Sequence, residues 1–168
     1  MQGEADAETD SGDRRDRSGP PMNARSWLRA GVVFLAVAQG AVGTVQLFAP
    51  KVFYDDFPTS SHPWVSLLPS YNEHLMRDVG ALTLAYTFVL VIAAVTMDRL
   101  LVRTALVANL IFTVPHFVFH AFHLEGFPTG DAIAQTILLG VGVLLPAVCL
   151  ALTWPAYPRG GVTRLARG

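Results

Sequence analysis

The sequence predicts an all-α protein, an integral membrane four-helix bundle with a disordered N-terminal tail. Of its 168 residues, 52% are hydrophobic and only 15% are charged, and soluble domains rarely combine these two values. Four apolar blocks lie between the ends of the chain, and each approaches the roughly 20 residues that cross a bilayer. Much of the charge falls in the first thirty and the last ten positions, outside these blocks.

Three regions follow from this distribution. We expect a disordered cytoplasmic tail over residues 1–24, a transmembrane domain over 25–156 and a second cytoplasmic tail over 157–168. The first tail is acidic and then mixed in charge, and it has almost nothing to bury. The spans are predicted at about 27–48, 73–97, 104–124 and 132–154, from the length that a bilayer requires.

The first span also has features of a secretory signal. Two arginines precede an apolar run, and Ala36-Val37-Ala38 before Gln39 forms a cleavage pattern. The apolar run continues to Phe48, which favours a retained span. Ala36, Gln39, Gly43 and Gln46 share one helix face, which predicts close contact with another helix and two buried amides.

The connections have their own signals. Residues 49–71 carry four prolines and five aromatic residues, typical of a cap at the membrane boundary. Asn72 is expected to cap the second span, and Glu73 to pair with Arg77 four residues later. Residues 98–103 are expected to form a short connector, and Asp131 to cap the fourth span.

The basic residues predict the orientation. They flank the ends of the chain and the connection between the second and third spans: Arg14, Arg15, Arg17, Arg25, Arg29, Arg99, Arg103, Arg159, Arg164 and Arg167. Only Lys51 lies clearly in another loop. By the positive-inside tendency both termini are cytoplasmic, in a multi-pass protein of a bacterial plasma membrane. No basic, aromatic-rich surface points to nucleic acid, and a single cysteine, Cys149, excludes an internal disulfide.

A row of polar side chains lies along the third span. Its five members are spaced 4, 3, 4 and 3 residues apart, so they share one helix face: Asn109, Thr113, His116, His120 and His123. Pro115 is expected to kink the helix just before His116. A polar face within a membrane turns away from lipid, towards other helices or a cavity.

Antiparallel spans bring a second polar group to the same depth. We therefore expect one outer-leaflet pocket, built from the start of the second span and the end of the third: Glu73, His74, Arg77, Asp78, His116, His120, His123 and Glu125. Asn109 belongs to the same polar network, as the first member of the row along the third span. Such a pocket suits a small ligand, a metal or a partner protein, and a hydrogen-bonded network that only fixes helix packing is the alternative.

A metal is one candidate ligand of this pocket. His116 and His120 are four residues apart, and His74 or Asp78 would complete a set for zinc, iron or haem. Acid–base chemistry is another possibility, because a histidine beside a carboxylate can move protons. The substrate would then be dissolved in the membrane and quinone- or isoprenoid-like. No nucleophile motif, phosphate loop or dinucleotide fingerprint supports other enzyme classes.

Two segments, YNEHLMRDVGALTLA (71–85) and PHFVFHAFHLEGF (115–127), carry a family resemblance. The chain resembles a group of small four-span membrane proteins of actinobacteria with NEH…RD and PH…FH…H motifs. Its layout over residues 27–154 is also similar to that of the DoxX-like superfamily. That resemblance implies an accessory role in a membrane redox complex, with a membrane-complex partner or a homo-oligomer besides the lipid bilayer.

Overall fold

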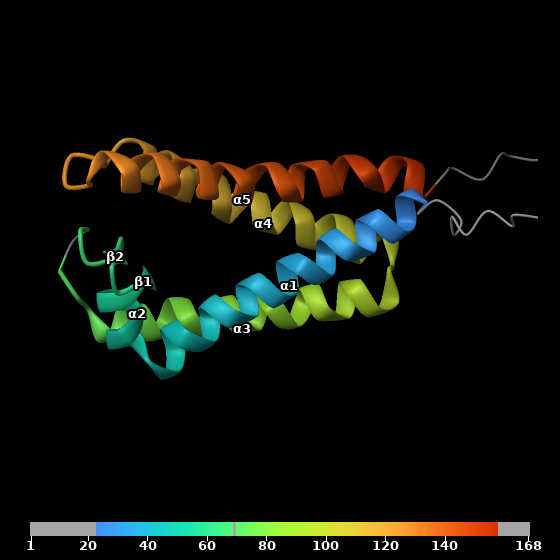
Figure 1. Cartoon of the computed structure of the whole chain (residues 1–168). Helices are drawn as coiled ribbons and strands as arrows, with labels where there is room; N and C mark the ends of the chain where they lie inside the picture. The colour runs from blue at the N-terminus through green and yellow to red at the C-terminus, as the bar shows by residue number, and fades with distance from the viewer. Residues whose placement is uncertain (1–22, 69, 158–168) are drawn as a thin grey trace, which may run out of the picture.

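The computed structural model of the protein describes residues 23–68 and 70–157 (Figure 1). Within them it has four long helices, α1 (Ala24–Phe48), α3 (Glu73–Thr96), α4 (Arg99–Ala121) and α5 (Thr129–Ala156). All four are long and apolar enough to cross a membrane. This confirms the predicted all-α four-helix bundle. The tails predicted at 1–24 and 157–168 fall, but for their inner ends, outside the described residues.

The connection from α1 to α3 carries the remaining elements. It begins with a short helix, α2 (Pro50–Asp56), and continues with two short strands, β1 (Pro58–Thr59) and β2 (His62–Pro63). The strands are antiparallel, with Pro58 opposite Pro63 and Thr59 opposite His62. The prolines therefore prevent a continuous helix here, as predicted, but they leave room for one helical segment of seven residues.

Side-chain caps mark the first residues of three of the long helices, α1, α3 and α4. The Asn72 side chain accepts from the Leu75 backbone N–H at 3.0 Å, which confirms the predicted cap of α3. The predicted connector 98–103 is wrong. Met97 takes a left-handed conformation (φ 49°) that closes α3, and Asp98 caps α4 by accepting from the Leu101 N–H. Since this turn needs only two residues, α4 begins at Arg99.

The cap predicted for the fourth span is also wrong. Helix α5 begins at Thr129, after Pro128, and Asp131 lies within its first turn. There its carboxylate bonds to His62 Nδ1 at 2.8 Å, across to the α1–α3 connection. Helix α4 continues through Pro115 to Ala121.

The helices pack as two pairs, which meet mainly through α1 and α5. Helix α1 lies along α3, α4 lies along α5, and α1 also contacts α5 (Figure 1). Helices α3 and α4 contact each other much less. We call the end that carries Ala24, Thr96, Arg99 and Ala156 the terminus end, and the opposite end the loop end. The two pairs separate towards the loop end (Figure 1).

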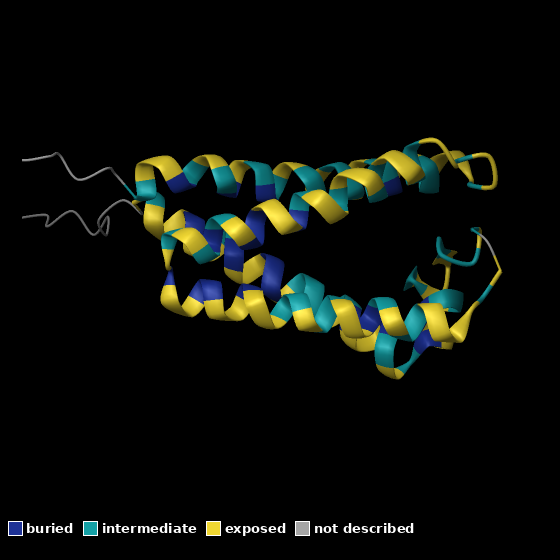
Figure 2. Ribbon diagram, turned by 180° about the vertical axis from the view of Figure 1, so that it is seen from behind, coloured by how far each residue is buried: buried dark blue, intermediate teal, exposed yellow. Residues whose placement is uncertain are grey.

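The buried apolar core lies in the half of the bundle near the terminus end. Its members come from the first part of α1 and α4 and from the last part of α3 and α5: Leu28, Val32, Leu35, Ala36, Leu90, Ala93, Ala94, Met97, Val102, Ala105, Leu106 and Cys149. Cys149 is 2% exposed, as expected for a small apolar residue. Figure 2 shows buried positions on the inward faces and exposed ones on the outer faces, which suits helices surrounded by lipid.

Two arginines of α1 hold the end of α3 at the terminus end. Arg29 donates to Ala94 O and Val95 O, both at 3.0 Å, and Arg25 donates to Met97 O at 3.5 Å. These carbonyls have no partner within the helix, so the guanidinium groups satisfy them. The Tyr157 hydroxyl also donates to Met97 O, and burial raises the pKa of this hydroxyl. We call these contacts the terminal clamp.

Glycines allow α1 and α3 to approach closely near the loop end. A Cβ on Gly80 would lie 2.6 Å from the Leu47 backbone nitrogen, and one on Gly43 would lie 3.2 Å from Gly80 O. No side chain larger than hydrogen fits at Gly80 without moving the α1 backbone. Gln46, beside this contact, is 9% exposed. The predicted small-residue face of the first span is thus confirmed at Gly43 and Gln46.

Candidate functional site

The charged residues at the start of α3 pair with each other and with α1. Arg77 donates to Glu73 at 2.9 Å, as predicted, and also to the Leu47 carbonyl of α1 at 2.5 Å. His74 Nε2 lies 3.2 Å from Asp78 Oδ2, and these two side chains are 86% and 57% exposed. This cluster therefore lies on the surface at the loop end.

The histidines of α4 make a different set of contacts. The His116 ring stacks on Phe112 and meets the His120 ring edge-on, with centroids 5.4 and 4.5 Å apart. His120 Nδ1 bonds to Gln135 Nε2 of α5 at 2.5 Å. His123 bonds to Phe119 O at 2.7 Å and is exposed, as is Glu125 in the next loop.

The structure does not bring the predicted metal ligands of the second and third spans together. No three His, Cys, Asp or Glu side chains within residues 23–68 and 70–157 lie close enough to hold one metal ion. His74 and Asp78 therefore do not join His116 and His120 in one site. The physical reason is the α1–α3 contact. Asp78 is two residues before Gly80, about 200° around the helix, so a face packed on α1 at Gly80 turns Asp78 outward.

Metal or haem binding by His116 and His120 alone stays a prediction. The two histidines are four residues apart on α4 and their rings are half-buried, but only His120 has a bond to α5, through Gln135. A structural zinc site takes four ligands and a catalytic one three protein ligands, and the described residues offer His120 an amide instead.

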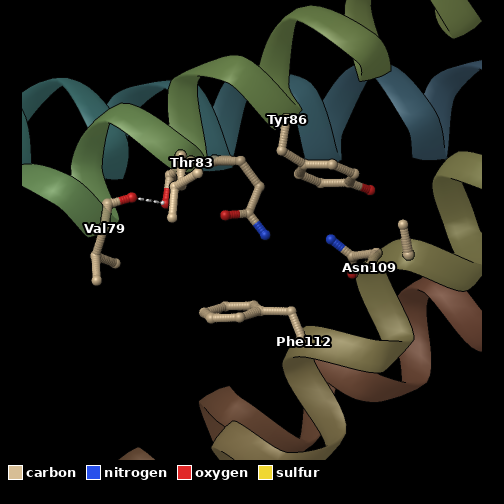
Figure 3. A pocket seen from close by; sticks show the side chains of 8 residues that line it. Val79, Thr83, Tyr86, Asn109 and Phe112 are labelled. Atoms are coloured by element: carbon tan, nitrogen blue, oxygen red, sulfur yellow. Dashed lines mark hydrogen bonds between the residues drawn. The ribbon is translucent and has the colours of Figure 1, made fainter.

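A cavity of about 270 Å³ lies deeper in the bundle, where α1 and α3 face α4. Its lining comes from all three helices: Gln39, Val79, Leu82, Thr83, Tyr86, Ala108, Asn109 and Phe112. Figure 3 shows Tyr86 and Thr83 of α3 on one wall, with Asn109 and Phe112 of α4 across from them. Asn109 is the eleventh of the 23 residues of α4, so the cavity lies near mid-span, deeper than the outer pocket predicted from the sequence.

Asn109 is the unsatisfied polar group of this cavity. The residue is 1% exposed, and neither its amide nitrogen nor its amide oxygen makes a hydrogen bond of normal geometry within residues 23–68 and 70–157, although the amide lies close to the Tyr86 hydroxyl. Its amide nitrogen points into the space that faces Tyr86 (Figure 3). The two neighbouring hydroxyls are already used as donors, by Tyr86 to Ala105 O and by Thr83 to Val79 O, both at 2.8 Å. An unpaired buried amide costs free energy, and a bound molecule could recover it.

Most of the cavity lining was not among the predicted site residues. Asn109 was predicted, but Thr83, Tyr86 and Phe112 were missed, as was Gln135 beside His120. A signal for α3 was present in the sequence. Val79, Leu82, Thr83 and Tyr86 follow the i, i+3, i+4, i+7 pattern of one helix face, and two hydroxyls interrupt that apolar face.

Four apolar spans with this packing define a multi-pass integral membrane protein. Comparison with known proteins found no matching family model, no similar curated protein and no similar solved structure. The resemblance to actinobacterial four-span proteins and the DoxX-like superfamily, the cytoplasmic termini and the bacterial plasma membrane therefore stay predictions.

Proposed function

We propose that this membrane protein binds a small lipid-soluble molecule in the mid-span cavity at Asn109. The observation that carries the proposal is the Asn109 amide, which is buried, points into a cavity and has no well-formed hydrogen bond among the residues that the structure describes. Buried polar groups in proteins are nearly always paired, and an unpaired one calls for an explanation. A ligand that pairs with the amide is such an explanation.

The composition of the cavity also supports a ligand site. Ligand pockets are mostly apolar, with a few polar groups that fix orientation. Here Val79, Leu82 and Phe112 provide apolar walls, and Gln39 and Asn109 provide amides. The proposed ligand site thus lies deeper than the predicted outer His/Asp/Glu pocket, at Asn109 of the predicted polar row.

Lipid extraction and mass spectrometry of protein purified in mild detergent test the proposal. We expect the wild-type chain to carry a molecule enriched over the bulk membrane lipids, and Asn109→Leu to lose roughly tenfold of that enrichment, as one or two lost hydrogen bonds imply. Thr113→Val is the matched control, because the Thr113 hydroxyl bonds to Asn109 O within the helix and does not line the cavity. Equal enrichment in wild type and Asn109→Leu, or none in wild type, contradicts the proposal.

The alternative is an enzyme or redox accessory subunit that acts on a membrane-dissolved substrate through histidine and carboxylate groups. It has weaker support, because the contacts of His116 and His120 within the described residues are with Phe112, Phe119, Gln135 and each other. Proton transfer of this kind requires a carboxylate within hydrogen-bond reach of the imidazole.

A further inference from the structure

We infer that the ligand of the mid-span cavity is an uncharged, chain-bearing lipid whose hydroxyl-type head pairs with Asn109 and whose chain leaves the bundle between α3 and α4. This inference rests on the proposed function and specifies its ligand class. Three features of the cavity carry it: the charge of its lining, the chemistry of the Asn109 amide and the exposure of its rim.

The lining is uncharged. None of its eight residues carries a formal charge at neutral pH. The nearest charged groups of α3 are in its first two turns, where Arg77 pairs with Glu73 and with the Leu47 carbonyl, and Asp78 pairs with His74. An ion placed in an apolar cavity without an opposite charge bears a large desolvation cost. The cavity therefore selects against carboxylates and ammonium groups.

The Asn109 amide pairs best with a head group that can both donate and accept a hydrogen bond. Asn109 Nδ2 is a donor, Oδ1 is an acceptor, and both are unpartnered. A hydroxyl can donate to Oδ1 and accept from Nδ2, whereas a hydrocarbon can do neither. Gln39, from α1, adds a second amide to the lining. The neighbouring hydroxyls of Thr83 and Tyr86 keep acceptor lone pairs, because each already donates to a backbone carbonyl.

The rim opens towards the surrounding lipid. Leu82 and Phe112 line the cavity and are also 71% and 51% exposed on the outside of the bundle. They come from α3 and α4, which are joined at Met97–Asp98 and contact each other little beyond that turn. The volume of about 270 Å³ is just below the range of ordinary ligand pockets, roughly 300–1,000 Å³. The head and the first part of a long chain fit inside, and the remainder lies in the bilayer.

Photolabelling with matched probes tests this inference on the full wild-type chain in lipid nanodiscs. The probes share a twelve-carbon chain with a diazirine near its polar end, and they end in a hydroxyl, a carboxylate, a trimethylammonium or a methyl group. We expect the hydroxyl probe to label residues 79–86 and 108–112, saturably and roughly tenfold more than the charged or methyl probes. Excess unlabelled dodecan-1-ol should abolish that labelling.

The outcomes separate the two proposals. Equal or stronger labelling of the cavity by a charged or methyl probe overturns the inference about ligand class and leaves a binding site in place. Absence of saturable cavity labelling by every probe overturns the proposed function as well. Asn109→Leu should reduce hydroxyl labelling to the level of the methyl probe, whereas Thr113→Val should leave it unchanged. The comparison of head groups on the wild-type chain needs no variant, so it does not depend on how a variant folds.

Discussion

The contact between α1 and α3 and the junction between α3 and α4 are built in opposite ways. At the first, Gly43 and Gly80 bring two backbones together, and Arg77 reaches across to the Leu47 carbonyl. At the second, the helices diverge after a two-residue turn and leave a cavity with an unpaired amide. Close packing of small residues is what holds helices together in lipid. Between α3 and α4 such packing is replaced by the cavity and by the bond from Tyr86 to Ala105 O.

The largest expected effect comes from filling the α1–α3 contact. Gly80→Ala places a Cβ 2.6 Å from the Leu47 backbone nitrogen, so we expect a loss of about 1–3 kcal/mol in the free energy of unfolding. Chemical denaturation in detergent micelles, followed by circular dichroism, measures it. Gly142→Ala is the control, because no atom in the described part of the chain lies within 4 Å of its added Cβ, and this change in a helix adds roughly 0.5–1 kcal/mol to the free energy of unfolding. If Gly80→Ala and Gly142→Ala changed the free energy of unfolding equally, the close α1–α3 contact would be contradicted.

A change of the opposite sign is expected at the α3–α4 junction. Asn109→Leu removes a buried amide without partners, so the protein free of ligand should gain about 1 kcal/mol in stability. Gln135→Leu, made in parallel, removes a buried amide that does bond to His120, and a loss of about 1 kcal/mol is expected. The same denaturation experiment on delipidated protein measures both. Destabilisation by Asn109→Leu would show that this amide is satisfied in the folded protein.

The smallest effect concerns the contact that spans the loop end. His62 bonds to Asp131 at 2.8 Å, and the two side chains are 57% and 13% exposed. Because the histidine stays open to water, we expect His62→Ala to lower stability by about 1 kcal/mol or less. His62→Ala leaves the rim at Leu82 and Phe112 unchanged. If the ligand enters from the bilayer at this rim, its enrichment in the variant should stay within twofold of wild type. A strong fall in enrichment at unchanged stability would instead place the route through the loop end.

The sequence predicted the elements of this fold better than their mutual arrangement. Apolar length located the four spans to within a few residues, and local rules found the Asn72 cap and the Glu73–Arg77 pair. These features depend on neighbours along the chain. The caps at Asp98 and Asp131 were misjudged, because a left-handed Met97 and a start at Thr129 shift the helix boundaries.

The candidate site was predicted only in part, because polarity does not decide which helix faces meet. Because the spans are antiparallel, the start of α3 and the end of α4 were correctly predicted to lie at the same end of the bundle, the loop end. It assumed that these faces turn towards each other, whereas the fit of Gly80 against α1 sets the rotation of α3. Asn109 was identified by its place in the polar row. Tyr86 and Thr83 were not, because hydroxyls on an apolar face are common in helices that only pack.

The terminal clamp also determines where this molecule can deform. Arg25, Arg29 and Tyr157 fasten three carbonyls at the close of α3 to α1 and to the residue after α5, and the apolar core lies directly beside them. The opposite ends of the helices lack such a core, and local opening is easiest where few apolar contacts are buried. Thermal motion should therefore be smallest at the terminus end and largest at the loop end. There the two helix pairs can move apart or together, limited by the bond between His62 and Asp131.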